Sequence, residues 1–179
     1  MENLVGGKSM KYLVVSDNHG DRNILVEIVN RYVNMVDHMF HCGDSALKAS
    51  DELWEHFTVV AGNCDYDPGY KKEQVLSIGN DIIYMTHGHL SNVRFGLTML
   101  SLQAQEVGAT IALFGHIHQA VAEYDKNILF VNPGSISQPR GPVQIPSYAI
   151  IDSQDEEIHV TFYNRAHQLI EELAADFKR

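Results

Sequence analysis

The chain has 179 residues, of which 45% are apolar, and this composition suits one domain with a real core and argues against a multi-domain protein. Its formal net charge is −10, from 23 acidic and 13 basic residues, which disfavours strong binding to long nucleic acids. Apolar runs reach only about six residues, against the roughly 20 of a membrane span, and no signal-peptide core precedes them, so we expect a cytoplasmic protein without a membrane segment.

The first residues are predicted to lie outside the domain. Residues 1–9 have no periodicity and indicate a tag remnant or a disordered extension, which assigns the domain to residues 10–179. From Met10 an apolar run predicts a strand that ends at Ser16. Asp21 then caps a predicted helix. The apolar residues of this helix follow the i, i+3, i+4 spacing of a core-facing surface: Ile24, Leu25, Ile28, Val29 and Tyr32.

Strands and helices continue to alternate after this helix. Residues 36–42 and 57–61 are predicted strands, with a short helix over residues 50–56 between them. This order of elements favours parallel pairing of the strands, because each strand is followed by a helix that can return the chain.

A predicted β-hairpin then interrupts the parallel order. Its strands are residues 74–78 and 81–86, joined by a primed turn at Gly79-Asn80. A second amphipathic helix is predicted over residues 92–107, and another apolar run follows it.

The rest of the chain is predicted to be mostly β. Strands are expected at residues 128–132, 147–152 and 158–164, and a closing helix over residues 166–177. Together the elements predict an α/β fold, a two-layer β-sandwich of mixed sheets flanked by helices.

Five apolar runs each end in a small residue followed by side chains that bind metals. Because such endings gather at one edge of a sheet, we expect these donors to converge. The predicted donors are Asp17, His19, Asp44, Asn63, His87, His116 and His118. Each pattern alone is usually an ordinary turn, but independent turns would not all carry metal-binding side chains. Seven donors are too many for one ion and suit two.

The donor types restrict the metal. Imidazole nitrogens suit Mn, Fe, Ni, Co or Zn better than Mg or Ca. Asp44 has two carboxylate oxygens and is the natural bridge between two ions, while Asn63 offers a neutral oxygen. Cys42 and Cys64 each lie beside a predicted donor, and we expect free thiols in a cytosolic chain.

These motifs resemble those of a known superfamily. Five segments resemble, in order, the five motifs of the calcineurin-like metallophosphoesterases. They are Asp17-x-His19, Gly43-Asp44, Gly62-Asn63-Cys64-Asp65, His87-Gly88-His89 and Gly115-His116-Ile117-His118. More closely, the chain resembles the bacterial YfcE/YsnB-like phosphodiesterases in three features: its short length, the Gly-Asn-Cys-Asp variant and the segment Asn132-Pro133-Gly134-Ser135.

The resemblance implies a division of the donors between two ions. One ion would be bound by Asp17, His19, Asp44 and His118, and the other by Asp44, Asn63, His87 and His116. It also implies a metal-bridging hydroxide that attacks a small phosphodiester, with manganese as the first expectation and Ni, Fe, Co or Zn as alternatives. Asn63, His87 and His116 would be catalytic, and Asn63 would also bind substrate.

One position departs from the superfamily pattern. Cys64 occupies the place where many members have a histidine that is thought to protonate the leaving group. The acid is then His89, His41 or water, or the substrate has a good leaving group. Arg94 could meet a phosphate, although a solvated surface position is favoured for it.

Two other functions are compatible with the sequence. A phosphomonoesterase of the same superfamily is disfavoured by the missing Gly-Asn-His and by a chain too short for large specificity insertions. A protein-interaction scaffold, as in a retromer subunit of the same fold, need not keep every metal ligand, whereas this chain has all seven. A homodimer is compatible with the strand pattern, but nothing in the sequence decides it.

Overall fold

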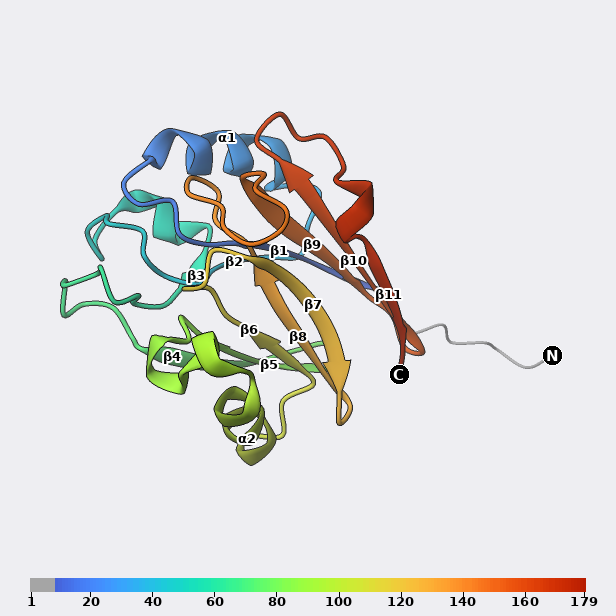
Figure 1. Ribbon diagram of the computed structural model, residues 1–179. Helices are drawn as coiled ribbons and strands as arrows, with labels where there is room; N and C mark the ends of the chain where they lie inside the picture. The colour runs from blue at the N-terminus through green and yellow to red at the C-terminus, as the bar shows by residue number, and fades with distance from the viewer. Residues whose placement is uncertain (1–8) are drawn as a thin grey trace.

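The computed structural model describes residues 9–179, and residues 1–8 of the expected extension lie outside the described part. Two sheets carry the architecture (Figure 1). The six-stranded sheet has the order β11-β10-β9-β1-β2-β3, and the five-stranded sheet has the order β4-β5-β6-β8-β7. These two mixed sheets confirm the predicted α/β sandwich.

The six-stranded sheet begins with the predicted parallel strands. Its first elements are β1 (Met10–Val15), α1 (Arg22–Tyr32), β2 (His38–His41) and β3 (Thr58–Val59). β1 pairs with β2, and β2 with β3, both in parallel. The predicted cap is present, because the Asp21 side chain accepts a hydrogen bond from the Ile24 amide.

Antiparallel strands complete this sheet. They are β9 (Ser147–Ser153), β10 (Glu157–Asn164) and β11 (Ala175–Lys178). β9 pairs with β1 on one side and with β10 on the other, and β11 pairs with β10. The two halves of the chain therefore meet at the β1–β9 pair.

The five-stranded sheet contains the predicted hairpin. Its strands are β4 (Glu73–Ile78), β5 (Asp81–Thr86), β6 (Ile111–Leu113), β7 (Ala120–Asp125) and β8 (Ile128–Pro133). The three central strands, β5, β6 and β8, are parallel to one another, while the edge strand β4 is antiparallel to β5 and the edge strand β7 is antiparallel to β8. Gly79 has a φ of +58° between the paired residues Ile78 and Asp81, as a primed turn requires.

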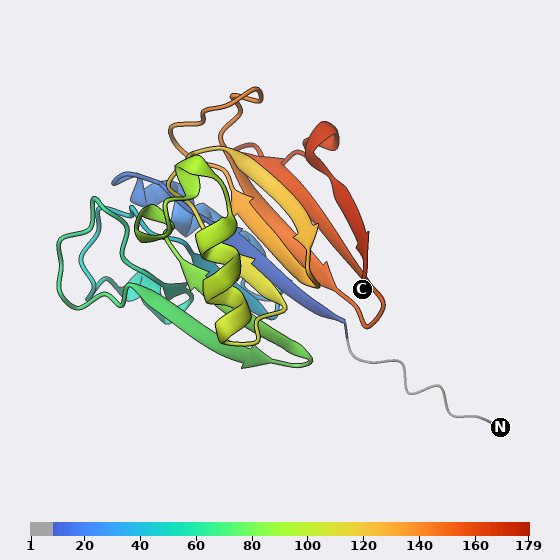
Figure 2. The ribbon, with the colours of Figure 1, turned by 60° about the horizontal axis from the view of Figure 1, so that its bottom comes forward.

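The core lies between the facing sheets and beneath one helix on each outer side. Tyr12 and Val14 of β1 pack in one cluster with Ile83 of β5 and Val131 of β8. α1 packs on the outer face of the six-stranded sheet, and α2 (Thr98–Glu106) covers the outer face of the five-stranded sheet (Figures 1 and 2). None of the described helices combines the length and apolarity needed to cross a bilayer.

The predicted closing helix over residues 166–177 is wrong. The structure has only a short 3₁₀ helix there, Glu171–Leu173, followed by β11. Ala174 has extended backbone angles, and Phe177 packs against the core between the sheets. Pairing with the open edge of β10 satisfies the backbone and buries the apolar side chain, which overrides the helical spacing of this segment.

Two predicted helices are shorter than expected. Residues 92–107 divide into a 3₁₀ helix, Val93–Phe95, and α2, because Gly96 between them has a φ of +123° that an α-helix cannot contain. The helix predicted at 50–56 is a 3₁₀ helix, Glu52–Glu55.

One strand was missed. β7 enters β8 through Lys126-Asn127, which have φ values of +49° and +60° without any glycine. The strong sequence signals for such a turn end in glycine, as Asn-Gly does, and Lys126-Asn127 lacks one.

Candidate metal centre

Parallel pairing brings the predicted donors to one edge. β1, β2 and β3 are neighbours in one sheet, β5 and β6 are neighbours in the other, and each of these strands runs into a donor loop. Backbone hydrogen bonds join the loops, from the Asp17 amide to Gly43 O at 3.0 Å and from the His19 amide to Asp44 O at 3.1 Å. The His116 amide donates to Asp17 Oδ2 at 3.2 Å and so connects the two sheets.

The donor loops have strained backbones. Five of the seven predicted donors have φ values in the left-handed region: Asp17, His19, Asp44, His116 and His118. Such a conformation costs roughly 1–2 kcal/mol for a residue with a side chain, and it persists only where surrounding contacts hold it. Strain concentrated on these residues indicates that the fold aims their side chains for a function.

One glycine allows the carboxylate of Asp44 to approach. A Cβ atom at Gly62 would overlap the Asp44 carboxylate, so another residue at this position would displace a donor. The carboxylate of Asp65 fixes the same loops by accepting hydrogen bonds from the Asp44 amide at 2.7 Å and the Gly62 amide at 2.8 Å.

A first donor group forms around Asp17. Donor atoms of Asp17, His19, Asp44 and His118 all lie within 4.8 Å of one another. His118 Nε2 is 3.1 Å from Asp17 Oδ1 and 3.2 Å from His19 Nε2. These four residues are those that the resemblance assigns to one ion.

A second donor group adjoins the first through Asp44. His87 Nε2 lies 3.4 Å from Asp44 Oδ2 and 3.1 Å from Asn63 Oδ1. His116 Nδ1 lies 2.9 Å from the same Asn63 oxygen. The structure thus brings together all seven predicted donors, and Asp44 stands between the two groups.

The hydrogen bonds of two histidines assign their protons. His118 Nδ1 lies 2.8 Å from Gln138 O, and His87 Nδ1 lies 2.7 Å from Cys42 O. A carbonyl can only accept, so each Nδ1 carries a proton, and in a neutral ring Nε2 presents a lone pair to the carboxylates. Asp17 Oδ1 is buried and has no hydrogen-bond partner. Converging lone pairs around an orphaned carboxylate oxygen fit a divalent cation.

Electrostatics support the same arrangement. Burial opposes the charged form of Asp17, but the neighbouring His118 and His87 rings and the hydrogen bond from Ser16 outweigh it and lower the pKa of this carboxyl. Burial likewise disfavours a charged His87 ring, yet Asp44 and Asp17 raise the pKa of His87. The pKa of His116 falls to about 4, through burial first and then the neighbouring His87 and Arg94. His116 is therefore neutral at neutral pH, which is the charge state that an imidazole needs as a metal ligand.

Several supporting residues carried little signal in the sequence. Ser16 Oγ donates to Asp17 Oδ2 at 2.5 Å, and Ser135 Oγ donates to Asp17 O at 2.7 Å. Asn132 Nδ2 donates to Gly115 O at 2.8 Å and holds the loop of His116. In the sequence, Asn132 and Ser135 were indicated only by the Asn-Pro-Gly-Ser segment, because hydrogen bonds between distant residues leave no local pattern.

The candidates for a general acid differ in their surroundings. His41 is fully buried, with Nε2 at 2.9 Å from Asn18 Oδ1 and the Gly43 amide donating to Nδ1, so neither nitrogen is available. The His89 ring lies 5.4 Å from the His87 ring and 6.0 Å from the His116 ring. Cys64 is a free thiol whose pKa is raised by burial and by the Asp44 charge.

Comparison with known protein families matches residues 10–156 to the calcineurin-like phosphoesterase superfamily domain. The chain belongs to this superfamily. The chain is 40% identical over 164 residues to the probable metallophosphoesterase YsnB of Bacillus subtilis. This alignment covers 92% of the chain and 96% of YsnB. The chain is also 31% identical over 147 residues to the phosphodiesterase YfcE of Escherichia coli, covering 76% of this chain and 67% of YfcE.

A solved structure agrees with this assignment. The crystal structure of a conserved uncharacterized protein and predicted phosphoesterase from Streptococcus pneumoniae superposes with a TM-score of 0.94 at 42% identity. The superposition covers 96% of this chain and 99% of that one. The resemblance read from the motifs is confirmed, and the His/Asp cluster is a metal-binding site typical of metallophosphoesterases.

Proposed function

We propose that this metallophosphoesterase hydrolyses a small phosphodiester with two divalent transition-metal ions bound at the seven donors. The observation that carries this proposal is the sharing of Asp44 between the two donor groups, 3.4 Å from His87 Nε2 and 4.0 Å from His19 Nε2. The diester is favoured over other esters because YfcE, which is 31% identical, is named a phosphodiesterase.

The donor set supports transition metals. Asp17, His19, Asp44 and His118 would hold one ion, and Asp44, Asn63, His87 and His116 would hold the other. Four of these donors are imidazoles, which favours Mn, Ni, Fe, Co or Zn, with manganese as our first choice. When bound, such ions supply an activated water and stabilise negative charge on the phosphoryl group.

Asn63 is proposed to bind the substrate directly. Its Oδ1 faces His87 and His116, while the hydrogen-bond partner of its Nδ2 within residues 9–179 is the soft sulfur of Cys64 at 3.5 Å. The side chain is exposed, so Nδ2 can donate to a non-bridging phosphate oxygen instead. That hydrogen bond would strengthen as charge builds on phosphorus in the transition state.

Water or His89 is proposed to protonate the leaving group. His41 is disfavoured because both of its ring nitrogens are already hydrogen-bonded inside the core. His89 is half-buried beside the donor groups, although burial lowers its pKa and reduces the protonated fraction at neutral pH.

A comparison of two substrates tests the function. Purified protein with Mn²⁺ is assayed on the diester and the monoester of the same aryl alcohol, and we expect faster hydrolysis of the diester. Much faster turnover of the monoester would support the phosphomonoesterase alternative. If neither ester is hydrolysed with Mn, Ni, Fe, Co or Zn, a protein-interaction scaffold becomes the better account of the chain's function.

A further inference from the structure

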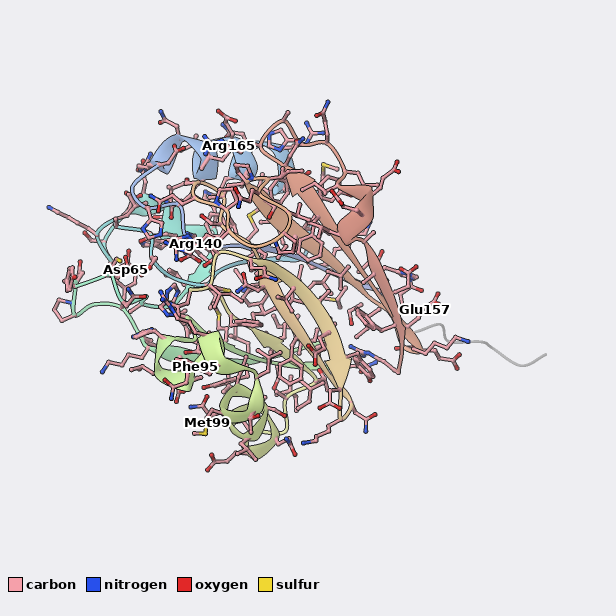
Figure 3. All side chains as sticks on the ribbon, viewed as in Figure 1. Asp65, Phe95, Met99, Arg140, Glu157 and Arg165 are labelled. Carbon is pink, nitrogen blue, oxygen red and sulfur yellow. The ribbon has the colours of Figure 1, made fainter. Side chains whose placement is uncertain are left out.

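Arg94 lies at the donor groups but has no role in the function proposed so far. It is exposed and belongs to the 3₁₀ helix Val93–Phe95. Its Nε donates to His116 Nε2 at 3.1 Å, so the sequence-based preference for a solvated surface position missed a contact with a donor residue. Figure 3 shows the neighbouring Phe95 at the same end of the molecule as the Asp65 loop, opposite Glu157.

The charge of Arg94 is not compensated nearby. Among residues 9–179, no carboxylate lies within ion-pair distance of its guanidinium, although the chain has 23 acidic residues. Three of the other five arginines are paired, Arg22 with Asp51, Arg165 with Asp21 and Arg179 with Asp81. Arg31 and Arg140 have no ion pair among residues 9–179, and within this range their guanidinium groups form no hydrogen bond to a donor residue. An exposed, unpaired guanidinium beside the donor groups is available to an anionic ligand.

The contact with His116 assigns the proton of that ring. An arginine Nε–H is always a donor, so His116 Nε2 must present a lone pair to it. The single proton of the neutral ring is then on Nδ1, where it donates to Asn63 Oδ1 at 2.9 Å. Arg94 thus holds the tautomer of His116 that has no lone pair directed at the second donor group.

Metal binding at His116 is incompatible with this tautomer. A cation bound by Nδ1 needs the lone pair of that nitrogen, so the ring proton must move to Nε2. The Nε–H of Arg94 would then face another N–H, and the contact would become repulsive. The side chain must turn away from His116 when the second donor group is loaded.

We infer that Arg94 is a substrate-recognition residue that His116 holds beside the donor groups in the metal-free protein and releases when metal binds. Once released, its guanidinium binds a non-bridging oxygen of the ester phosphate, for which its planar fork is suited. This inference rests on the proposed function, since it assumes that a phosphate ester occupies the metal-loaded site.

Variants of the full-length, Mn²⁺-loaded protein test this role. Arg94→Gln removes the charge, Arg94→Lys keeps the charge without the fork, and Arg31→Gln removes an exposed arginine that contacts none of the donors. Calorimetry measures the affinity for inorganic phosphate, and steady-state kinetics measures KM and kcat for the aryl diester.

We expect Arg94→Gln to weaken phosphate binding about tenfold and to raise KM by a similar factor with little change in kcat, because the contact is made in both ground and transition states. Arg94→Lys should lose less phosphate affinity than Arg94→Gln, and Arg31→Gln should have the phosphate affinity and KM of the wild type. Phosphate affinity in Arg94→Gln equal to that of the wild type, or no phosphate binding by the wild type, overturns the inference.

A second measurement does not depend on turnover. Imidazole ¹H–¹⁵N spectra of the protein, with His116 assigned through His116→Gln, should show its proton on Nδ1 without metal and on Nε2 with Zn²⁺. A proton on Nε2 in the metal-free protein contradicts the holding contact. The two proposals can fail separately: an inactive wild type whose phosphate binding depends on Arg94 contradicts only the proposed function, and an active wild type with unaffected Arg94 variants contradicts only this inference.

Discussion

At the scale of single residues, the site depends on which way each ring and carboxylate is held. Backbone carbonyls of Cys42 and Gln138 fix the Nδ1 protons of His87 and His118, so both rings turn Nε2 toward the carboxylates. Asp17 is oriented by Ser16 and keeps one oxygen without a hydrogen bond. Donors held in this way need little reorganisation to bind a cation, which favours tight binding.

Asp44→Asn tests the residue that joins the two donor groups. The amide keeps the oxygen that accepts from the Cys64 amide at 2.8 Å but loses the negative charge, so the loop should stay in place while metal binding weakens. We expect Mn²⁺-dependent hydrolysis to fall at least about 100-fold, with an unchanged circular dichroism spectrum. Near-normal turnover in this variant would contradict the shared role of Asp44.

His41 gives a second test at this scale, through pH. Burial lowers its pKa from 6.5 to about 4, so the unfolded chain takes up a proton on this residue before the folded chain does. Its contribution to stability is complete above pH 6.5 and is lost as the pH falls toward 4. As the pH falls from 7 to 5, we expect the unfolding free energy to drop by about 2 kcal/mol because His41 is protonated in the unfolded chain but not in the folded one.

Urea unfolding of metal-free protein at these two pH values measures this effect. His41→Gln lacks the titrating group, and its unfolding free energy should therefore depend less on pH than that of the wild type. Equal pH dependence in the two proteins would show that His41 is not held neutral.

At the scale of elements, local patterns predicted the segments whose neighbours in space agree with them. β1, α1 and the β4–β5 hairpin were predicted because apolar spacing, the Asp21 cap and the Gly79 turn all favour the observed structure. The segment 166–177 was predicted wrongly, because its helical spacing is also compatible with a strand and the open edge of β10 decided between them. Such pairing is not visible in the segment's own sequence.

Phe177→Ala tests the strand assigned to the C-terminal segment. The Phe177 ring stacks on Tyr124 at a centroid distance of 5.9 Å, and so joins β11 to a strand of the other sheet. Since the side chain is only partly buried, we expect a loss of about 1–2 kcal/mol in unfolding free energy, less than for a fully buried phenylalanine. Lys178→Ala is the exposed control, and equal stability of the two variants would argue against this packing.

At the scale of the whole molecule, the site exists only when both sheets are assembled. Strands of the six-stranded sheet lead into Asp17, His19, Asp44 and Asn63. Strands of the five-stranded sheet lead into His87, His116 and His118. Their convergence was predictable because the ends of neighbouring parallel strands share an edge. The ring protons, the left-handed loops and the contact of Arg94 with His116 were not predictable, since they depend on how the two sheets meet.

The most direct test of the account is the number and position of bound cations. Elemental analysis of Mn²⁺-loaded protein, together with anomalous diffraction from its crystals, should give two ions per chain, both in contact with Asp44. A protein that binds no metal under these conditions, or a metal-loaded crystal in which the donors of the two groups point away from each other, would contradict the account.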